Sequence, residues 1–221
     1  MGRRHQANCP YHRGPYHRGP NQSSATMAST PASEIARATL TDSVVVARPW
    51  QAGDAPQLFE AARESIATVG PWLSWLDSHN SLADAERWVD ASLEHWQRGT
   101  EFRFAVVDSS ASAWLLGGVG LNHLNTAHGI GNLGYWVRAS ATRRGVASRA
   151  ARRVAQFGLT AGGLGRIEIL TAVDNVASQQ GADRIGAGFE GLLRDRLLVR
   201  GQRIPARLYA LVRRDLPGTP A

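Results

Sequence analysis

GYWVRASATRRGVASRAARRVAQFGLTA, residues 134–161, is the stretch of sequence that decides the fold. Its first four residues are apolar or aromatic, which predicts a buried strand. Ser140 and Thr142 are turn and cap residue types, so we expect the strand to end before them. Beyond them, apolar side chains recur at helical spacing, at Ala150, Val154 and Phe157. The stretch therefore predicts a strand, a short basic loop and a helix.

The loop between this strand and this helix is a candidate anion site. It comprises Arg143, Arg144, Gly145, Val146, Ala147 and Ser148. A small-residue loop that opens a helix exposes backbone N–H groups, and the helix dipole adds partial positive charge there. We therefore expect it to bind a diphosphate. The alternative is an ordinary strand-to-helix turn with solvated arginines, because short glycine motifs give many false matches.

A second polar motif, Asn175-Val-Ala-Ser178, opens another helix 27 residues after Ser148. The two motifs together are more specific than either alone.

Length and composition favour one domain. The chain has 221 residues, of which 43% are hydrophobic, enough for one well-filled core. No apolar run approaches the roughly 20 residues of a membrane helix, so no membrane partner is expected. Cys9 is the only cysteine, and no apolar segment follows the early arginines as it would in a secretory signal. These features favour a cytoplasmic protein.

Residues 1–40 differ in composition from the rest of the chain. Tyr11-His-Arg-Gly-Pro15 is repeated at once, a Ser/Thr/Ala-rich segment follows, and residues 1–26 hold four arginines and no acid. This composition predicts a disordered basic extension without a fold. The alternative is a basic arm that contacts RNA or the ribosome. Its histidines and Cys9 match no structural zinc pattern, so no metal is expected.

Residues 41–215, followed by a tail at 216–221, carry strand and helix patterns in alternation. Strands are predicted at 43–49, 102–108, 114–124, 129–138, 165–173, 191–199 and 206–213, with a turn at 109–112 and the last hairpin turning at Gly201-Gln202. Helices are predicted from 53–54 onward, at 81–98, at 148–160 after the loop, and at 177–185.

One crossover fixes the sheet type. Strand 132–138 leads through the helix to strand 166–173, so these two strands should be parallel, whereas short turns make the other neighbours antiparallel. The sequence thus predicts an α/β (α+β) domain with a mixed, mostly antiparallel sheet and helices on both faces. Ligands favour the carboxyl ends of parallel strands beside helix N-termini.

Five motifs in this order resemble the GNAT superfamily of acetyl-CoA-dependent N-acetyltransferases, and within it the Rim-type ribosomal-protein N-terminal acetyltransferases. The resemblance covers about residues 41–215. The motifs are Pro71-Trp-Leu-Ser-Trp75, Gly134-Tyr-Trp-Val137, the loop 143–148, Asn175-x-x-Ser178 and Glu190-Gly191.

The resemblance implies that the two parallel strands splay apart and that the acetyl-pantetheine arm of acetyl-CoA inserts between them. Backbone groups of Trp136, Val137 and Arg138 would extend the pantetheine, and the N–H groups of loop 143–148 would hold the diphosphate. Asn175 would bind the pantetheine, and Ser178 would protonate the leaving thiolate. Asn175 and Ser178 could also serve simply as the cap and the first turn of their helix.

Trp72 and Trp75 are candidates for the acceptor side of the site. They flank a loop after Pro71, where they could line a cleft for the substrate; the alternative is that they only cap the core.

The chain departs from the family pattern where a carboxylate base often stands. Asn132-Leu133 precedes the Gly-Tyr-Trp motif, and Leu197 occupies the later position. Asp195, Glu101 and His123 are weaker candidates. Thr142 stands where the loop usually opens with Gln or Arg, and Gly186-Ala187 replaces the usual Gly-Phe pair.

The missing base favours an acceptor of low pKa. An α-amine with pKa near 7.8 is roughly a third neutral at pH 7.5, whereas a lysine amine is about 0.1% neutral, a difference of about 3.5 kcal/mol. The sequence therefore predicts direct acetyl transfer to a protein N-terminus, with the carbonyl oxygen stabilised by a backbone N–H near Val137.

Three alternatives stay open. They are an acetyltransferase for a small amine such as an antibiotic or polyamine, a non-catalytic acyl-CoA-binding module, and a ribosome- or RNA-associated protein. The sequence leaves open whether the chain is a monomer or a homodimer.

Overall fold

The computed structural model describes residues 38–73, 75–76, 81–110 and 114–216. Nearly all of the predicted extension 1–40, most of the tail 216–221 and part of the predicted turn 109–112 lie outside these ranges.

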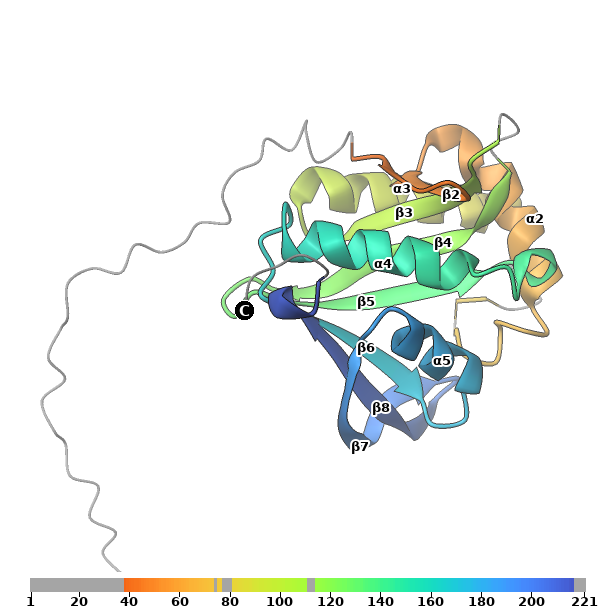
Figure 1. Cartoon of the computed structure of the whole chain (residues 1–221). Helices are drawn as coiled ribbons and strands as arrows, with labels where there is room; N and C mark the ends of the chain where they lie inside the picture. The colour runs from red at the N-terminus through yellow and green to blue at the C-terminus, as the bar shows by residue number, and fades with distance from the viewer. Residues whose placement is uncertain (1–37, 74, 77–80, 111–113, 217–221) are drawn as a thin grey trace, which may run out of the picture.

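The described residues form one eight-stranded sheet in the order β1-β2-β3-β4-β5-β6-β8-β7 (Figure 1). All neighbouring strands are antiparallel except β5 and β6, as the crossover predicts. The strands are β1 (Leu40–Thr41), β2 (Val45–Pro49), β3 (Phe102–Asp108), β4 (Leu115–Asn125), β5 (Ile130–Val137), β6 (Arg166–Ala172), β7 (Gly188–Val199) and β8 (Gln202–Val212).

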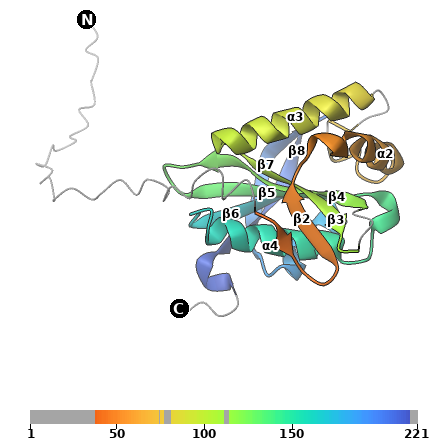
Figure 2. The same ribbon diagram turned by 90° about the horizontal axis from the view of Figure 1, so that it is seen from above.

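Helices cover both faces of the sheet. Figure 2 shows α2 (Ala55–Ser65) and α3 (Leu82–Arg98) on one face and α4 (Val146–Leu159) on the other. The short helix α5 (Val176–Arg184) lies beside β6 (Figure 1). The predicted fold class, with a single domain and a parallel pair, is confirmed. None of the helices in the described ranges has the length and apolar character needed to cross a membrane.

The helix α3 shows how local sequence sets an element. Ser81 caps it by accepting a hydrogen bond from the Asp84 N–H, and the Asp84 carboxylate bonds back to Ser81, forming a capping box. Gly99 ends the helix in the left-handed conformation, with φ 64°. Its apolar side, including Val89 and Trp96, is buried.

Two apolar clusters sandwich the sheet. The cluster on the α4 side is built on Leu121, Leu133, Val154, Phe157 and Ile167. The cluster on the α2–α3 side contains Trp50, Leu58, Val89, Leu115 and Trp136. Successive β5 side chains therefore belong to opposite clusters, as strand geometry requires.

The parallel strands β5 and β6 pair over only three positions, Ile130↔Arg166, Gly131↔Ile167 and Asn132↔Glu168. Both strands continue beyond that point, β5 to Val137 and β6 to Ala172. Their ribbons diverge in Figure 1. The two strands are therefore unpaired with each other beyond Asn132 and Glu168, and we call this separation of their backbones the gap.

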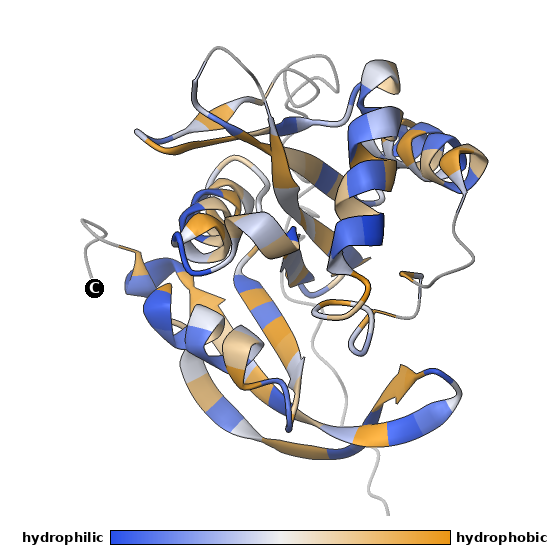
Figure 3. Ribbon diagram, turned by 90° about the vertical axis from the view of Figure 1, so that its right-hand side faces the viewer, coloured by the Kyte–Doolittle hydropathy of each residue, from blue (hydrophilic) through white to orange (hydrophobic). Residues whose placement is uncertain are grey.

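The closing hairpin is longer than the sequence predicts and turns one residue earlier. Val199 pairs with Gln202, so Arg200 and Gly201 form a two-residue turn, with φ of 49° and 78°. Pro205 argues against a strand at this point of the sequence, but it lies where the β7–β8 register shifts, a place that tolerates a missing N–H. The hairpin curves away from the rest of the sheet in Figure 3.

The tip of this hairpin is tied to the loop after α2. The Arg200 guanidinium donates to the carbonyl oxygen of Gly70 at 3.0 Å. The C-terminal hairpin and the tryptophan-bearing loop thus contact each other across 130 residues of chain.

Candidate functional site

The loop that follows β5 has an unusual backbone. Arg143 has φ 62° and Gly145 has φ 75°, so two residues within three adopt the left-handed conformation. Gly145 is the N-cap of α4, and a Cβ added there would meet only Arg149, at 3.7 Å. The glycine is therefore required for its backbone angle and not for space. Arg143 takes up that angle at a cost, which is typical of binding loops.

The N–H groups of this loop are free to bind an anion. Within the described ranges, no acceptor is bonded to the backbone N–H of any residue from Arg143 to Ser148. The Ser148 hydroxyl donates to the Gly145 carbonyl at 3.1 Å, which fixes the first turn of α4. The side chain of Arg144 is 53% exposed and has only a 3.8 Å approach to Asp108. Donors and positive charge thus converge on one loop.

The backbone of β5 presents alternate groups to the gap. The Arg138 N–H donates to the Leu116 carbonyl at 2.9 Å, so it points toward β4. Since backbone groups alternate along a strand, Trp136 also points toward β4, whereas Val137 and Tyr135 point toward the gap. Of the three residues expected to contact a pantetheine through their backbone, the structure directs only Val137 into the gap, and it adds Tyr135.

The Arg138 side chain lies within the protein. It is 4% exposed, donates to the Leu115 carbonyl at 3.1 Å and lies 4.3 Å from the Trp114 ring centre. It also forms an ion pair with Glu64 at the end of α2, its Nε at 3.0 Å from the carboxylate.

Glu64 anchors the turn that leads into the loop. Besides Arg138, the Ser140 N–H donates to it. Burial raises the pKa of Glu64, but the hydrogen bonds from Arg138 and Ser140 outweigh burial and lower the pKa to about 2. The carboxylate is therefore ionised at neutral pH and holds the end of β5 against α2.

At the other side of the gap, α5 begins directly after β6. The Asn175 side chain accepts from the Ser178 N–H at 3.1 Å, so Asn175 caps the helix. Gln179 ties the helix to the end of β6, donating to the carbonyls of Ala172 and Val173 at 3.1 and 2.7 Å. The Asn175 amide nitrogen donates to no residue within the described ranges. The cap role and a ligand role for Asn175 are compatible.

Tyr135 is a site residue that sequence reasoning missed. Its hydroxyl donates to the Ser178 carbonyl at 2.7 Å and lies 3.4 Å from the Ser178 hydroxyl. A Cβ on Gly181 would lie 2.6 Å from that hydroxyl, so the glycine makes room for the tyrosine. Burial raises the pKa of Tyr135, which keeps the phenol protonated. Tyr135 thus bridges β5 to α5, and its position inside the Gly-Tyr-Trp motif is the signal that could have found it.

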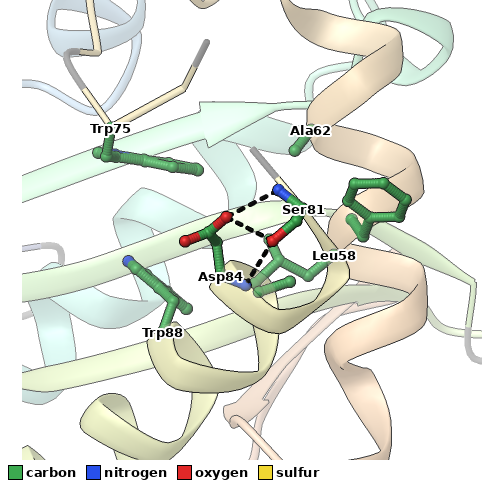
Figure 4. A pocket seen from close by; sticks show the side chains of 8 residues that line it. Leu58, Ala62, Trp75, Ser81, Asp84 and Trp88 are labelled. Carbon is green, nitrogen blue, oxygen red and sulfur yellow. Dashed lines mark hydrogen bonds between the residues drawn. The ribbon is translucent and has the colours of Figure 1, made fainter. Parts of the chain in front are cut away.

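Of the two tryptophans expected at the acceptor side, one lines a cavity on the α2–α3 face and the other does not. Trp75 and Trp88 line a cavity between α2 and α3 (Figure 4), with their ring centres 6.0 Å apart. The ring of Trp75 also lies 5.9 Å from that of Trp136. Trp72, the other tryptophan expected at the acceptor side, is half-buried in the same loop and does not line that cavity. Trp136 therefore contributes its ring to this face.

The possible bases lie in different surroundings. Glu101 is ion-paired with Arg103 at 2.6 Å, and His123 is exposed where the β4–β5 register shifts. Asp195 is exposed on the hairpin. Within the described ranges, no contact joins any of these three residues to the residues around the gap.

Glu168 is the carboxylate that the sequence did not single out. It is the register partner of Asn132 at the last β5–β6 pair, so its side chain lies on the same sheet face as that of Asn132, at the point where the gap opens. Asn132 donates to the Asn122 side chain at 2.8 Å, and Glu168 accepts from Arg166 at 3.0 Å. Only the register of the parallel pair brings Glu168 to this position.

Comparison with known proteins gives a consistent result. The family model described as "Acetyltransferase (GNAT) domain" matches residues 45–188. YdaF of Bacillus subtilis (strain 168), provisionally named a ribosomal N-acetyltransferase, is 25% identical over 170 residues, 75% of this chain and 89% of its own length. The ribosomal-protein-serine acetyltransferase of Escherichia coli (strain K12) is 26% identical over 140 residues, 63% of this chain and 76% of its own length.

Solved structures show the same fold. RimL, a ribosomal L7/L12 alpha-N-protein acetyltransferase solved with coenzyme A, superposes with a TM-score of 0.73 at 19% identity. The superposition covers 79% of this chain and 98% of that one.

Proposed function

We propose, from the premise that this chain belongs to the GNAT family of acetyltransferases, that it acetylates the N-terminal α-amine of a protein, with ribosomal proteins as the acceptor class. The observation that carries the proposal is the gap between β5 and β6, which opens beside a loop of unbonded N–H groups. The strand backbone along the gap suits the amide groups of an acyl-pantetheine. The N–H donors at the end of the gap suit the diphosphate that the pantetheine carries.

The loop from Arg143 to Ser148 would hold the diphosphate of acetyl-CoA. Its N–H groups have no other acceptor within the described ranges, and the N-terminus of α4 adds partial positive charge. The backbone groups of Val137 and Tyr135 would bond the amide groups of the pantetheine, as a neighbouring strand would. The Asn175 amide nitrogen would donate to a pantetheine carbonyl from the other side of the gap.

The chemistry is direct acyl transfer. The neutral amine attacks the thioester carbonyl, so the new C–N bond forms as the C–S bond breaks. The Val137 N–H would stabilise the charge that develops on the carbonyl oxygen. The Ser178 hydroxyl would give its proton to the departing thiolate and would be reprotonated, through water, by the proton that the amine loses. Glu168 is a carboxylate in register with the gap that could take part in this relay.

The acceptor class is supported by the relatives and by the chemistry of the site. Two curated relatives are named for ribosomal acetylation. The carboxylate at the gap, Glu168, is already paired with Arg166, so a strong base is not in place. An α-amine needs less help to lose its proton than a lysine amine does. This function would place the protein in the cytoplasm with the ribosomes.

A small-molecule amine is the second candidate acceptor. The cavity lined by Trp75 and Trp88 is the observation that favours it, because a cavity of about 200 Å³ would hold part of a small ligand. A peptide substrate would use the same cavity for one side chain only.

The test compares two matched peptides with acetyl-CoA, one with a free N-terminus and no lysine, the other with a blocked N-terminus and one lysine. Free-thiol release should be at least tenfold faster with the first peptide. Equal rates, or turnover of the lysine peptide alone, would contradict the proposed acceptor. Thermal unfolding with and without acetyl-CoA provides an independent check, since bound ligand should raise the Tm.

A further inference from the structure

The cavity between α2 and α3 combines aromatic walls with one carboxylate. It has a volume of about 200 Å³ and is lined by Leu58, Phe59, Ala62, Trp75, Ser81, Asp84, Ala85 and Trp88. In Figure 4 the Asp84 carboxylate lies near the two indole rings of Trp75 and Trp88. The rest of the lining is apolar except Ser81. A single, partly exposed negative group therefore stands beside a largely apolar lining.

The Asp84 carboxylate is charged and only partly neutralised. The Ser81 hydroxyl and N–H donate to Oδ2 at 2.6 and 2.8 Å, and these bonds lower the pKa of Asp84. Its other oxygen, Oδ1, is paired with Arg87, whose side chain is 70% exposed. An exposed pair of this kind contributes little free energy and exchanges readily with other cations. Oδ1 is therefore available to a cation that reaches the cavity.

Two indole rings beside a carboxylate suit a lysine or arginine side chain, whose charged group is carried on an aliphatic chain. Tryptophan is the strongest of the aromatic rings in attracting ammonium and guanidinium groups. The aliphatic carbons of a lysine or arginine side chain also gain from contact with apolar walls. The neighbouring Arg103, whose guanidinium lies 5.2 Å from the Trp88 ring centre, shows that this indole already accepts a cation on one face.

The cavity is close to the gap between β5 and β6. Trp136 lies on β5 next to Val137, Trp75 lies 5.9 Å from Trp136, and Trp88 lies 6.0 Å from Trp75. An extended peptide advances about 3.3 Å per residue. An acceptor whose α-amine lies at the gap would therefore reach the cavity within about four residues.

We propose that this cavity is a specificity site for a basic side chain, arginine or lysine, among residues two to four of the acceptor. The proposal rests on the proposed function, because it needs a peptide acceptor. It adds a sequence preference that the family membership does not supply.

The test uses peptides with free N-termini that differ at one position, residue two, three or four. At that position each carries lysine, norleucine or glutamate; norleucine matches the lysine stem without its charge. At one of the three positions, kcat/KM should be about tenfold higher for lysine than for norleucine, and lowest for glutamate. The preference should weaken as salt is raised.

Two arginine variants on α3 sharpen the test. Arg87→Ala removes the cation that pairs with Asp84, so the lysine preference should increase at least threefold. Arg98→Ala is the matched control: Arg98 is also 70% exposed and pairs with a carboxylate one turn away, but that carboxylate, Glu94, does not line the cavity. It should leave the preference unchanged.

The outcomes separate the two proposals. Equal kcat/KM for lysine and norleucine at all three positions, in wild type and Arg87→Ala, would overturn the specificity site and leave N-terminal acetylation intact. A preference for norleucine would also overturn it, in favour of an apolar site. No turnover of any free N-terminal peptide would overturn the proposed function, and the specificity site with it.

Discussion

The two edges of β5 differ in how completely they are paired. Toward β4, the register runs from Gly117↔Val137 to Asn125↔Ile130, almost the whole strand. Toward β6, it ends after three positions. One edge of the same strand therefore contributes to the stability of the sheet along almost its whole length, while the other has no strand partner beyond Asn132 in the part of the chain that the structure describes. Variants on the two sides should accordingly fail in different assays.

The largest effect is expected from a change in the loop Arg143 to Ser148, which follows β5 at the end of the gap. Gly145→Ala places a Cβ on a residue with φ 75°, which costs about 1–2 kcal/mol unless the loop rearranges. Rearrangement would turn the N–H groups away from the diphosphate. We expect acetyl-CoA affinity to fall about 100-fold, measured by calorimetry. Gly53→Ala is the control, since a Cβ there meets nothing within 4 Å; similar affinities for both variants would contradict the role of the loop.

A variant on the side of β5 that pairs with β4 should lower the free energy of unfolding and leave the rate of acetyl transfer unchanged. Glu64→Gln removes the charge opposite the buried Arg138, and we expect a loss of about 2 kcal/mol in unfolding free energy at pH 7, reduced by the partial exposure of Glu64.

The sign of the pH dependence follows from the lowered pKa of Glu64, about 2 in the folded state. The contribution is complete above the ordinary pKa near 4.5 and is lost as the pH falls toward 2. Denaturant unfolding from pH 7 to pH 2 should show the two proteins converging at low pH. A constant difference would contradict this origin.

A variant of Tyr135 tests the hydrogen bond that links β5 to α5 across the gap. Tyr135→Phe removes the hydrogen bond to the Ser178 carbonyl while keeping the ring. If the phenol positions the Ser178 hydroxyl, kcat should fall about tenfold, or about 1.4 kcal/mol, while KM for acetyl-CoA changes less than twofold. Steady-state kinetics at saturating acceptor measure this. A fall in Tm with unchanged kcat would show that the contact is only structural.

The smallest effect is expected on β6. Thr171 is 2% exposed, and its hydroxyl has no hydrogen-bond partner within the described ranges. Thr171→Val keeps the shape and removes an unpaired polar group, so the protein should gain about 1 kcal/mol of stability. Thr171→Ser keeps the hydroxyl and should not show this gain. Destabilisation by valine would indicate a partner for the hydroxyl.

Local patterns predicted most of the fold. The strand, loop and helix of residues 134–161, the capped helix α3 and the crossover that makes β5 and β6 parallel all follow from periodicity and cap residues. The position of the Asn175 cap could also be predicted, because a cap bonds within its own helix.

The contacts that shape the site could not be predicted in this way. Tyr135 meets Ser178 across 43 residues, and Arg138 meets Glu64 across 74. Glu168 reaches the gap only through the register of a parallel pair, which no local signal specifies. The length of that pairing, and so the size of the gap, depends on how the sheet twists and on what packs against each face.

The order of the strands has a consequence for how the protein is made. β8 lies between β6 and β7 in the sheet, yet it is synthesised last of the three. Until residues 202–212 have left the ribosome, the strand pairing of β6 is limited to its three pairs with β5 and lacks the seven that it forms with β8. The three strands beyond the gap therefore cannot be assembled stepwise from the N-terminus. A nascent chain should acquire the ability to hold the thioester in one step, when its final hairpin emerges.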